Sequence, residues 1–145
     1  MVENPDSVMV VPRFDDGDTM LVRQWRHAWD ESSWEVPAGT LNEGEAPADC
    51  ARRELAEETG LRAERYRSLG MVHGAAILTG RAHLYLAEGL TSSDRSPETY
   101  EQDMEVLRLP LREAIEAALA GEIAHSGSVT SLIRAASALG LISLR

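Results

Sequence analysis

The segment 39–61 reads GTLNEGEAPADCARRELAEETGL, and it predicts a helix that is closed by glycine. Residues 46–59 contain no internal glycine, and their only proline, Pro47, stands near the start, where a helix tolerates proline. Gly60 follows as a C-terminal stop. The segment is therefore expected to form a loop followed by a helix of about four turns.

Three carboxylates share one face of this predicted helix. Glu54 has Glu57 and Glu58 three and four positions further on, and Arg53 reaches Glu57 by the same four-residue step. Like charges at this spacing repel, and a hard divalent cation would compensate that repulsion. Mg²⁺ prefers oxygen ligands and is usually held by a few carboxylates together with substrate phosphates. A merely solvated acidic surface is the alternative, and three glutamates alone do not exclude it.

Length and charge limit the classes of function. With 145 residues, the chain is expected to form a single domain, 1–145, that buries about 70% of its unfolded surface. Its formal net charge of -10 argues against a surface that coats nucleic acid, because such a surface needs a basic stripe. An anionic ligand must therefore be met by a few placed arginines or by a metal ion.

The single cysteine and the four histidines indicate the compartment and the metal chemistry of the protein. Cys50 is the only cysteine, so a reducing cytoplasm is the predicted compartment, and Cys50 is expected to pack in the core and not to act as a nucleophile. The four histidines show no zinc-ligand spacing with Cys50 and are interpreted as structural or surface residues. The start of the chain shows no basic leader and no apolar stretch long enough for a membrane segment.

Outside the segment 39–61, strand and helix patterns alternate irregularly. Residues 8–14 and 19–26 are β-prone and flank a turn on Asp16-Gly17, which predicts a hairpin. Further strands are expected at 34–36, 67–73, 82–88 and 104–109. Helices are expected at 110–121, closed by Gly121, and in the last segment, capped by Ser126 or Ser128. This mixture favours an α/β sandwich around a mixed sheet.

Nine positions of the segment 39–61 have a fixed spacing. They are Gly39, Glu45, Arg53-Glu54-Leu55, Glu57-Glu58 and Gly60-Leu61, separated by intervals of five, seven, one and one residues. A chance match at nine specified positions has a probability on the order of 10⁻¹⁰ per starting point. The spacing matches the Nudix box at every specified position, so the chain resembles the Nudix hydrolases.

This resemblance implies a Nudix-type α/β/α sandwich and a Mg²⁺-dependent or Mn²⁺-dependent hydrolase of nucleoside diphosphates linked to another group X. By position, Glu54, Glu57 and Glu58 would be metal ligands, direct or through water. Arg53 would orient these glutamates, and Glu45 would support the box structurally. The box alone does not identify X.

The residues before the box resemble the ADP-ribose pyrophosphatase branch of that family. The run RQWRHAWDESSWEVPAG has the Gln-aromatic-Arg strand end and the Glu-apolar-Pro-Ala-Gly entry of the branch. The resemblance implies that Arg26 meets the pyrophosphate or the terminal ribose and that the Ala38 carbonyl joins the metal shell. Two features depart from the branch: residues 62–79 lack its usual proline, and the longer amino-terminal sheet region is missing. ADP-ribose or a related nucleotide sugar is the expected substrate, and oxidised nucleotides remain open.

Other candidate site residues lie outside the box. Glu101, in the acidic run SPETYEQDMEV, is the predicted general base, with Glu57 as the alternative; Glu98, Asp103 and Glu105 belong to the same run. Any of Trp25, Trp29 and Trp34 is a candidate to stack on a nucleobase, with Trp25 as the predicted substrate contact, whereas two of the three are expected to fill core or a subunit contact. Arg81 is a candidate phosphate contact.

Two other functions remain open at this point, and a partner is expected. A housecleaning triphosphatase would release pyrophosphate from a nucleoside triphosphate, and a non-catalytic sensor would bind a nucleotide without turnover. The expected partner is a small nucleotide, with no membrane contact. A homodimer is the predicted assembly because symmetric pairs dominate soluble oligomers.

Overall fold

The computed structural model describes residues 1–92 and 104–144, and they form two sheets and three helices. The strands are β1 (Ser7–Pro12), β2 (Asp18–Arg26), β3 (Glu31–Glu35), β4 (Ala38–Thr40), β5 (Leu61–His73), β6 (Arg81–Ser92) and β7 (Glu105–Pro110). The helices are α1 (Pro47–Thr59), α2 (Leu111–Ala120) and α3 (Ser126–Ala138). One sheet has the order β4-β1-β6-β5 and the other has the order β3-β2-β7.

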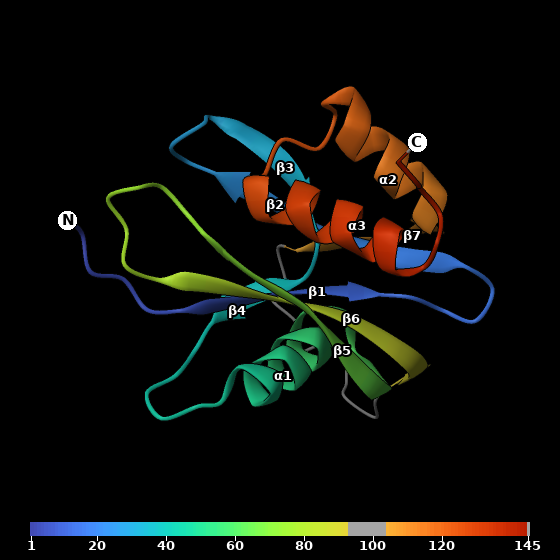
Figure 1. Ribbon diagram of the computed structural model, residues 1–145, viewed down its shortest axis with the longest axis horizontal. Helices are drawn as coiled ribbons and strands as arrows, with labels where there is room; N and C mark the ends of the chain where they lie inside the picture. Colours follow the sequence, from blue (N-terminus) through green and yellow to red (C-terminus); the bar gives the residue numbers. More distant parts are fainter. Residues whose placement is uncertain (93–103, 145) are drawn as a thin grey trace.

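The larger sheet is mixed and lies between helices. Strand β1 pairs with β6 in parallel and with β4 antiparallel, and β5 pairs with β6 antiparallel. Figure 1 shows α1 on one side of this sheet and α3 on the other, with α2 beside α3. The predicted α/β sandwich around a mixed sheet is therefore confirmed.

The predicted hairpin between the first two strands is wrong. Strand β1 pairs with β4 and β6, whereas β2 pairs with β3 and β7 in the other sheet. The turn itself exists, since the Gly17 N–H donates to the Phe14 carbonyl at 2.9 Å. Strand β1 is apolar on both faces: Val8 and Val10 pack toward α1, and Val11 packs in the core under α2 and α3. Such a strand is satisfied at the centre of a sheet, where both its faces are covered.

Helix α1 has the predicted length and ends where the sequence indicates. Pro47 occupies its first turn, and Gly60 closes it in the left-handed conformation with φ 72°. Leu55 is fully buried against the sheet together with Cys50 and Ala51. This apolar stripe turns the opposite stripe of α1, which carries Glu54 and Glu57, toward the strand β4 and its flanking loops.

The two C-terminal helices pack together on the other side of the sheet. Helix α2 follows Pro110 and is closed by Gly121 with φ 85°, as predicted. Helix α3 is capped by His125, whose side chain accepts a hydrogen bond from the Ser128 N–H, so the predicted cap at Ser126 or Ser128 is wrong. Ser128 is fully buried, and its hydroxyl accepts a hydrogen bond from the Val36 N–H, just after β3. A capping side chain has to lie before the first helical N–H groups, and His125 does.

Strands β5 and β6 are longer than the sequence pattern indicates, because Leu61 begins β5 directly after α1 and Ser92 ends β6. They pair along most of their length with one irregularity between Ser68 and Met71. In the described part of the chain, none of the helices combines the length and apolar character needed to cross a bilayer.

Candidate functional site

Arg53 is the centre of the ionic network on α1. Its Nε and Nη2 donate to the two carboxylate oxygens of Glu45 at 3.0 and 2.9 Å, and Nη1 donates to Glu54 at 2.7 Å and to Glu57 at 3.4 Å. Nη2 also donates to the Thr40 carbonyl at 3.1 Å. One guanidinium therefore ties the loop before α1 to two of the three predicted ligands.

Charge pairing shifts the pKa values of this network in the directions that keep it ionised. The hydrogen bonds from Arg53 and the Asn42 N–H lower the pKa of Glu45 to about 2. The Glu45 carboxylate and the nearby Glu54 in turn raise the pKa of Arg53. The sequence assigned Glu45 to structural support, and its contacts are of that kind.

Glu58 is held from the strand side. The Ala38 N–H lies 3.3 Å from each of the two Glu58 carboxylate oxygens, and Glu58 is only 6% exposed. Ala38 follows Val36-Pro37, which connect β3 of the three-stranded sheet to β4 of the four-stranded sheet. The chain entering the box thus positions a carboxylate on the last turn of α1.

Gly39 leaves the space that Glu54 fills. A Cβ atom built on Gly39 would lie 2.0 Å from the Glu54 Cδ and 2.2 Å from its Oε1, far inside van der Waals contact. The Glu54 carboxylate therefore rests directly on the backbone of β4. The fixed glycine of the motif is explained by this close approach.

The donor set of this region suits a hard divalent cation. Carboxylate oxygens of Glu54 and Glu58 lie against the backbone of Gly39 and Ala38, and Arg53 links Glu57 to Glu54. Mg²⁺ and Mn²⁺ prefer such oxygen ligands. Within residues 1–92 and 104–144, no group of three His, Cys, Asp or Glu side chains forms a preassembled metal cluster. Because Mg²⁺ keeps several waters and shares its shell with substrate phosphates, a closed protein cage is not required.

Arg26 forms a buried ion pair next to the box. Its Nε donates to the Glu35 Oε2 at 2.9 Å and its Nη2 donates to Oε1, while the Glu35 side chain has no exposed surface. Burial by itself raises the pKa of Glu35, but the Arg26 hydrogen bond and the other nearby groups outweigh it and hold that pKa below its usual value. Hydrogen bonding to Glu35 raises the pKa of Arg26, and the negative charge of Glu58 raises it further. Arg26 therefore interacts electrostatically with one carboxylate of the box.

A cavity of about 470 Å³, which we call the tryptophan pocket, opens beside Arg26. It is lined by Trp25, Arg26, His27, Ala28, Trp29 and His125. Trp25 is 52% exposed and Trp29 is 46% exposed. Only the third tryptophan, Trp34, packs against the core. The expectation that two tryptophans fill core or a subunit contact is therefore not met for the core.

His125 connects the tryptophan pocket to the chain that enters the box. Its Nδ1 lies 2.8 Å from the Ser128 Oγ, and this hydroxyl accepts a hydrogen bond from the Val36 N–H at 3.0 Å. The spacing of the four histidines does not distinguish His125 from the other three, so this position was not predicted. A signal was present: Glu35 lies between apolar Trp34 and Val36, and a carboxylate in a buried strand needs cationic and polar partners.

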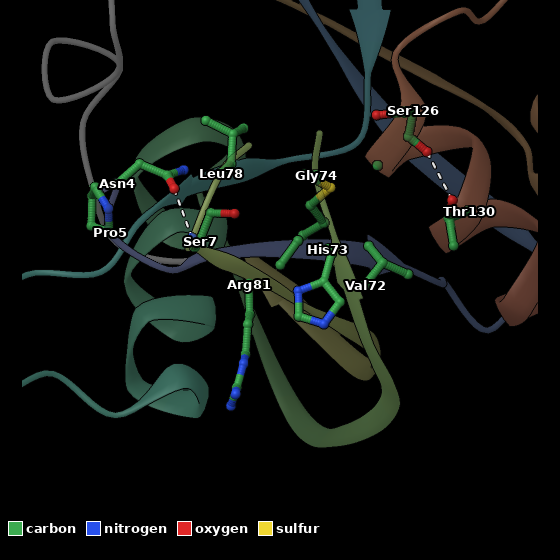
Figure 2. A pocket seen from close by; sticks show the side chains of 14 residues that line it. Asn4, Pro5, Ser7, Val72, His73, Gly74, Leu78, Arg81, Ser126 and Thr130 are labelled. Carbon is green, nitrogen blue, oxygen red and sulfur yellow. Dashed lines mark hydrogen bonds between the residues drawn. The ribbon is translucent and has the colours of Figure 1, made fainter. Parts of the chain in front are cut away.

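A second cavity, of about 350 Å³, lies on the other side of the α3 N-terminus. Ser7, His73, Arg81 and Ser126 are among its lining residues. Figure 2 shows the Arg81 side chain extending away from Ser126 and Thr130. The Arg81 backbone N–H donates to Asp6 at 2.9 Å. The structure thus places the two predicted phosphate contacts, Arg26 and Arg81, in different pockets.

The predicted general base lies outside the described residues. Glu101 falls in the segment 93–103, as do Glu98 and Asp103. Glu105 is described and forms an ion pair with Arg23 at 3.2 Å. Cys50 is fully buried, and burial raises the pKa of its thiol to about 12, in agreement with the predicted packing role.

Comparison with known proteins agrees with this geometry. A family model described as NUDIX domain matches residues 3–127. An ADP-ribose pyrophosphatase of Mycobacterium tuberculosis is 36% identical over 92% of this chain, and one of Bacillus subtilis is 31% identical over 80%. A crystal structure titled as an ADP compounds hydrolase superposes with a TM-score of 0.82 at 21% identity, covering 94% of this chain and 74% of that chain, which establishes the same fold.

The match covers only part of the length of each of the two pyrophosphatases. This chain spans 66% of the length of the Mycobacterium tuberculosis protein and 64% of the Bacillus subtilis protein. The resemblance to the ADP-ribose pyrophosphatase branch, predicted from the residues before the box, is nevertheless confirmed over most of this chain.

Proposed function

Since this chain belongs to the NUDIX domain family, we propose that it hydrolyses the pyrophosphate bond of a nucleoside diphosphate derivative, with ADP-ribose or a related nucleotide sugar as substrate. The products are a nucleoside monophosphate and a phosphorylated second product. The observation that carries this proposal is the Glu54 carboxylate resting on Gly39, with the Ala38 N–H holding Glu58 and Arg53 pairing with Glu54 and Glu57.

The carboxylates of the box bind the cation on which the reaction depends. Glu54, Glu57 and Glu58 are its proposed ligands, direct or through water, together with the Ala38 carbonyl. A cation held there would supply neutralisation of the diphosphate charge and would lower the pKa of water in the site. It also explains how a chain with a formal net charge of -10 accepts an anionic substrate.

Side chains of the protein carry out the proton transfer and the positioning of the substrate. Water attacks one phosphorus of the diphosphate, a new P–O bond forms, and the bridging P–O bond breaks to release the other phosphate. Glu101 takes the proton of the attacking water, with Glu57 as the alternative base. Arg53 keeps Glu54 and Glu57 oriented during this step, and Arg26 contacts the anionic part of the substrate beside the box.

Product analysis tests the proposal. Incubation of ADP-ribose with Mg²⁺ or Mn²⁺ is expected to release AMP and ribose 5-phosphate, and chelation by EDTA is expected to stop the reaction. Glu57→Gln is expected to lower kcat about 10²-fold or more. Glu116→Gln, an exposed acid on α2, is the matched control and is expected to leave kcat unchanged.

A substrate panel separates the other functions. Pyrophosphate released from a nucleoside triphosphate, with ADP-ribose left intact, would identify a triphosphatase. Nucleotide binding without turnover under either cation would identify a sensor. A Glu57→Gln variant with full kcat would remove the carboxylate cluster from the mechanism.

A further inference from the structure

The hydrogen bonds at the start of α3 fix the tautomer of His125. The Ser128 N–H donates to the His125 Nδ1 at 3.3 Å, and an N–H group can only donate. Nδ1 must therefore carry its lone pair. The Ser128 hydroxyl accepts from the Val36 N–H, so its own proton is directed to the same Nδ1 at 2.8 Å. In the neutral ring that results, the proton is on Nε2.

The surroundings of His125 keep this ring neutral. Burial lowers the pKa of His125, Arg26 acts in the same direction, and Glu35 opposes both. Glu35 lies 3.8 Å from Nδ1, too far for a hydrogen bond, and its carboxylate is already held by Arg26. His125 therefore enters the pocket as a neutral donor and not as a cation.

The tryptophan pocket offers this donor to a flat ligand. Ser128 occupies Nδ1 at the start of α3, and His125 lines the cavity, so Nε2 is the ring nitrogen left to donate to a ligand there. The Trp29 ring lies 6.3 Å from the His125 ring, and the Arg26 guanidinium lies 6.0 Å from the Trp29 ring. Exposed indole faces stack on nucleobases, and each nucleobase carries ring-nitrogen or carbonyl acceptors on its edge.

We infer that His125 determines specificity for the nucleobase by donating a hydrogen bond from Nε2 to an acceptor on the edge of a base stacked in the tryptophan pocket. This inference rests on the proposed function, because it takes the substrate to be a nucleotide whose diphosphate lies at the box. Arg26 lines the tryptophan pocket and pairs with Glu35, on the strand that precedes the box.

Imidazole nitrogen spectra of the full chain test the inference without turnover. In ¹⁵N-histidine-labelled protein at neutral pH, His125 is expected to show an unprotonated Nδ1 and a protonated Nε2. AMP without divalent cation is expected to shift the Nε2 resonance, whereas ribose 5-phosphate, which lacks the base, is expected to leave it in place. His73 lines the second cavity and serves as an internal reporter of binding there.

A matched pair of variants measures the contribution of the donor. His125→Asn keeps an acceptor for the Ser128 N–H, because Asn caps helices well, but its shorter amide does not reach as far into the pocket. We expect AMP affinity to fall about 10-fold, as for one lost hydrogen bond to a desolvated partner, with ribose 5-phosphate affinity unchanged. His73→Asn makes the same change in the other cavity and is expected to have no effect.

Several outcomes overturn the inference. They are a proton on Nδ1 of the free protein, a shift of His73 in place of His125, equal responses to AMP and ribose 5-phosphate, or unchanged AMP affinity in His125→Asn. Because AMP binding is measured without turnover, a chain that binds AMP through His125 but hydrolyses nothing contradicts only the proposed function. A hydrolase whose His125 ignores AMP contradicts only this inference.

Discussion

Glu35 and Arg26 form an ion pair whose two members are shielded from water to different degrees. The Glu35 side chain has no exposed surface, whereas the Arg26 side chain is 34% exposed. Loss of the arginine therefore leaves a buried carboxylate without its guanidinium partner, while loss of the carboxylate leaves a cation that water can still reach. The two substitutions are expected to differ in cost for this reason.

We expect Arg26→Met to destabilise the protein by about 2 kcal/mol at neutral pH, a value reduced from the usual cost of breaking a buried pair because Arg26 is partly exposed. Glu35→Gln is expected to cost less. The pairing holds the Glu35 pKa below its usual value, so the stabilisation it gives is present above the unfolded pKa and is lost as pH falls through the folded pKa. Urea unfolding at neutral and acidic pH measures the free energy of unfolding of the parent and both variants. The loss caused by Arg26→Met is expected to be smaller in acid.

Arg23→Met is the matched control on the same strand. Arg23 and its partner Glu105 are 43% and 65% exposed, so this surface pair is expected to contribute at most about 1 kcal/mol. Equal losses for Arg23→Met and Arg26→Met would show that burial of Glu35 does not set the cost.

Strand β4 contacts helix α1 at Gly39, where the strand has no side chain. Gly39 is followed by the loop to α1, and Arg53 fixes that loop through Glu45 and the Thr40 carbonyl. The obstacle to a larger residue at position 39 is the carboxylate end of Glu54, which is flexible. A methyl group there displaces the carboxylate more readily than it distorts the backbone.

Gly39→Ala is therefore expected to reduce hydrolysis much more than stability. We expect kcat/KM to fall about 10²-fold as the Glu54 carboxylate moves from its position, with unfolding free energy changed by less than about 1 kcal/mol. Gly74→Ala is the matched control, because its new Cβ would meet only Leu78 Cδ1 at 3.2 Å. Full activity with ADP-ribose in Gly39→Ala would mean that the position of Glu54 is not critical.

At the scale of the whole molecule, α3 connects the two sheets through Ser128. The helix packs on β1, β5 and β6 of the mixed sheet, and the buried Ser128 hydroxyl accepts from the Val36 N–H just after β3 of the other sheet. Val36 lies two residues before Ala38, whose N–H holds Glu58. A C-terminal helix thus supports the chain that enters the box.

Ser128→Ala is expected to destabilise the protein by about 1–3 kcal/mol, because the buried Val36 N–H loses its acceptor. Ser137→Ala, at an exposed position of the same helix, is expected to stay within about 0.5 kcal/mol of the parent. Urea unfolding of both variants measures the two values. A Ser128→Ala variant as stable as Ser137→Ala would show that the hydrogen bond to Val36 does not contribute to the free energy of unfolding.

Local spacing along the chain is enough to predict several features of this protein. The bounds of α1, its closure at Gly60 and the shared face of Glu54 and Glu57 follow from helical periodicity and glycine chemistry. The family and its branch followed from the same short segment and the residues before it. These features need no knowledge of what lies far away along the chain.

Long-range packing selects the pairing of β1, the cap of α3 and the partners of Glu35. Residues 8–14 and 19–26 fit a hairpin locally, but β1 pairs with residues 29 to 75 positions away because its two apolar faces require cover on both sides. His125 and Arg26 meet at Glu35 from opposite ends of the chain. Burial removes water as an alternative partner, so the folded arrangement, and not the local sequence, selects which charges and hydrogen bonds are paired.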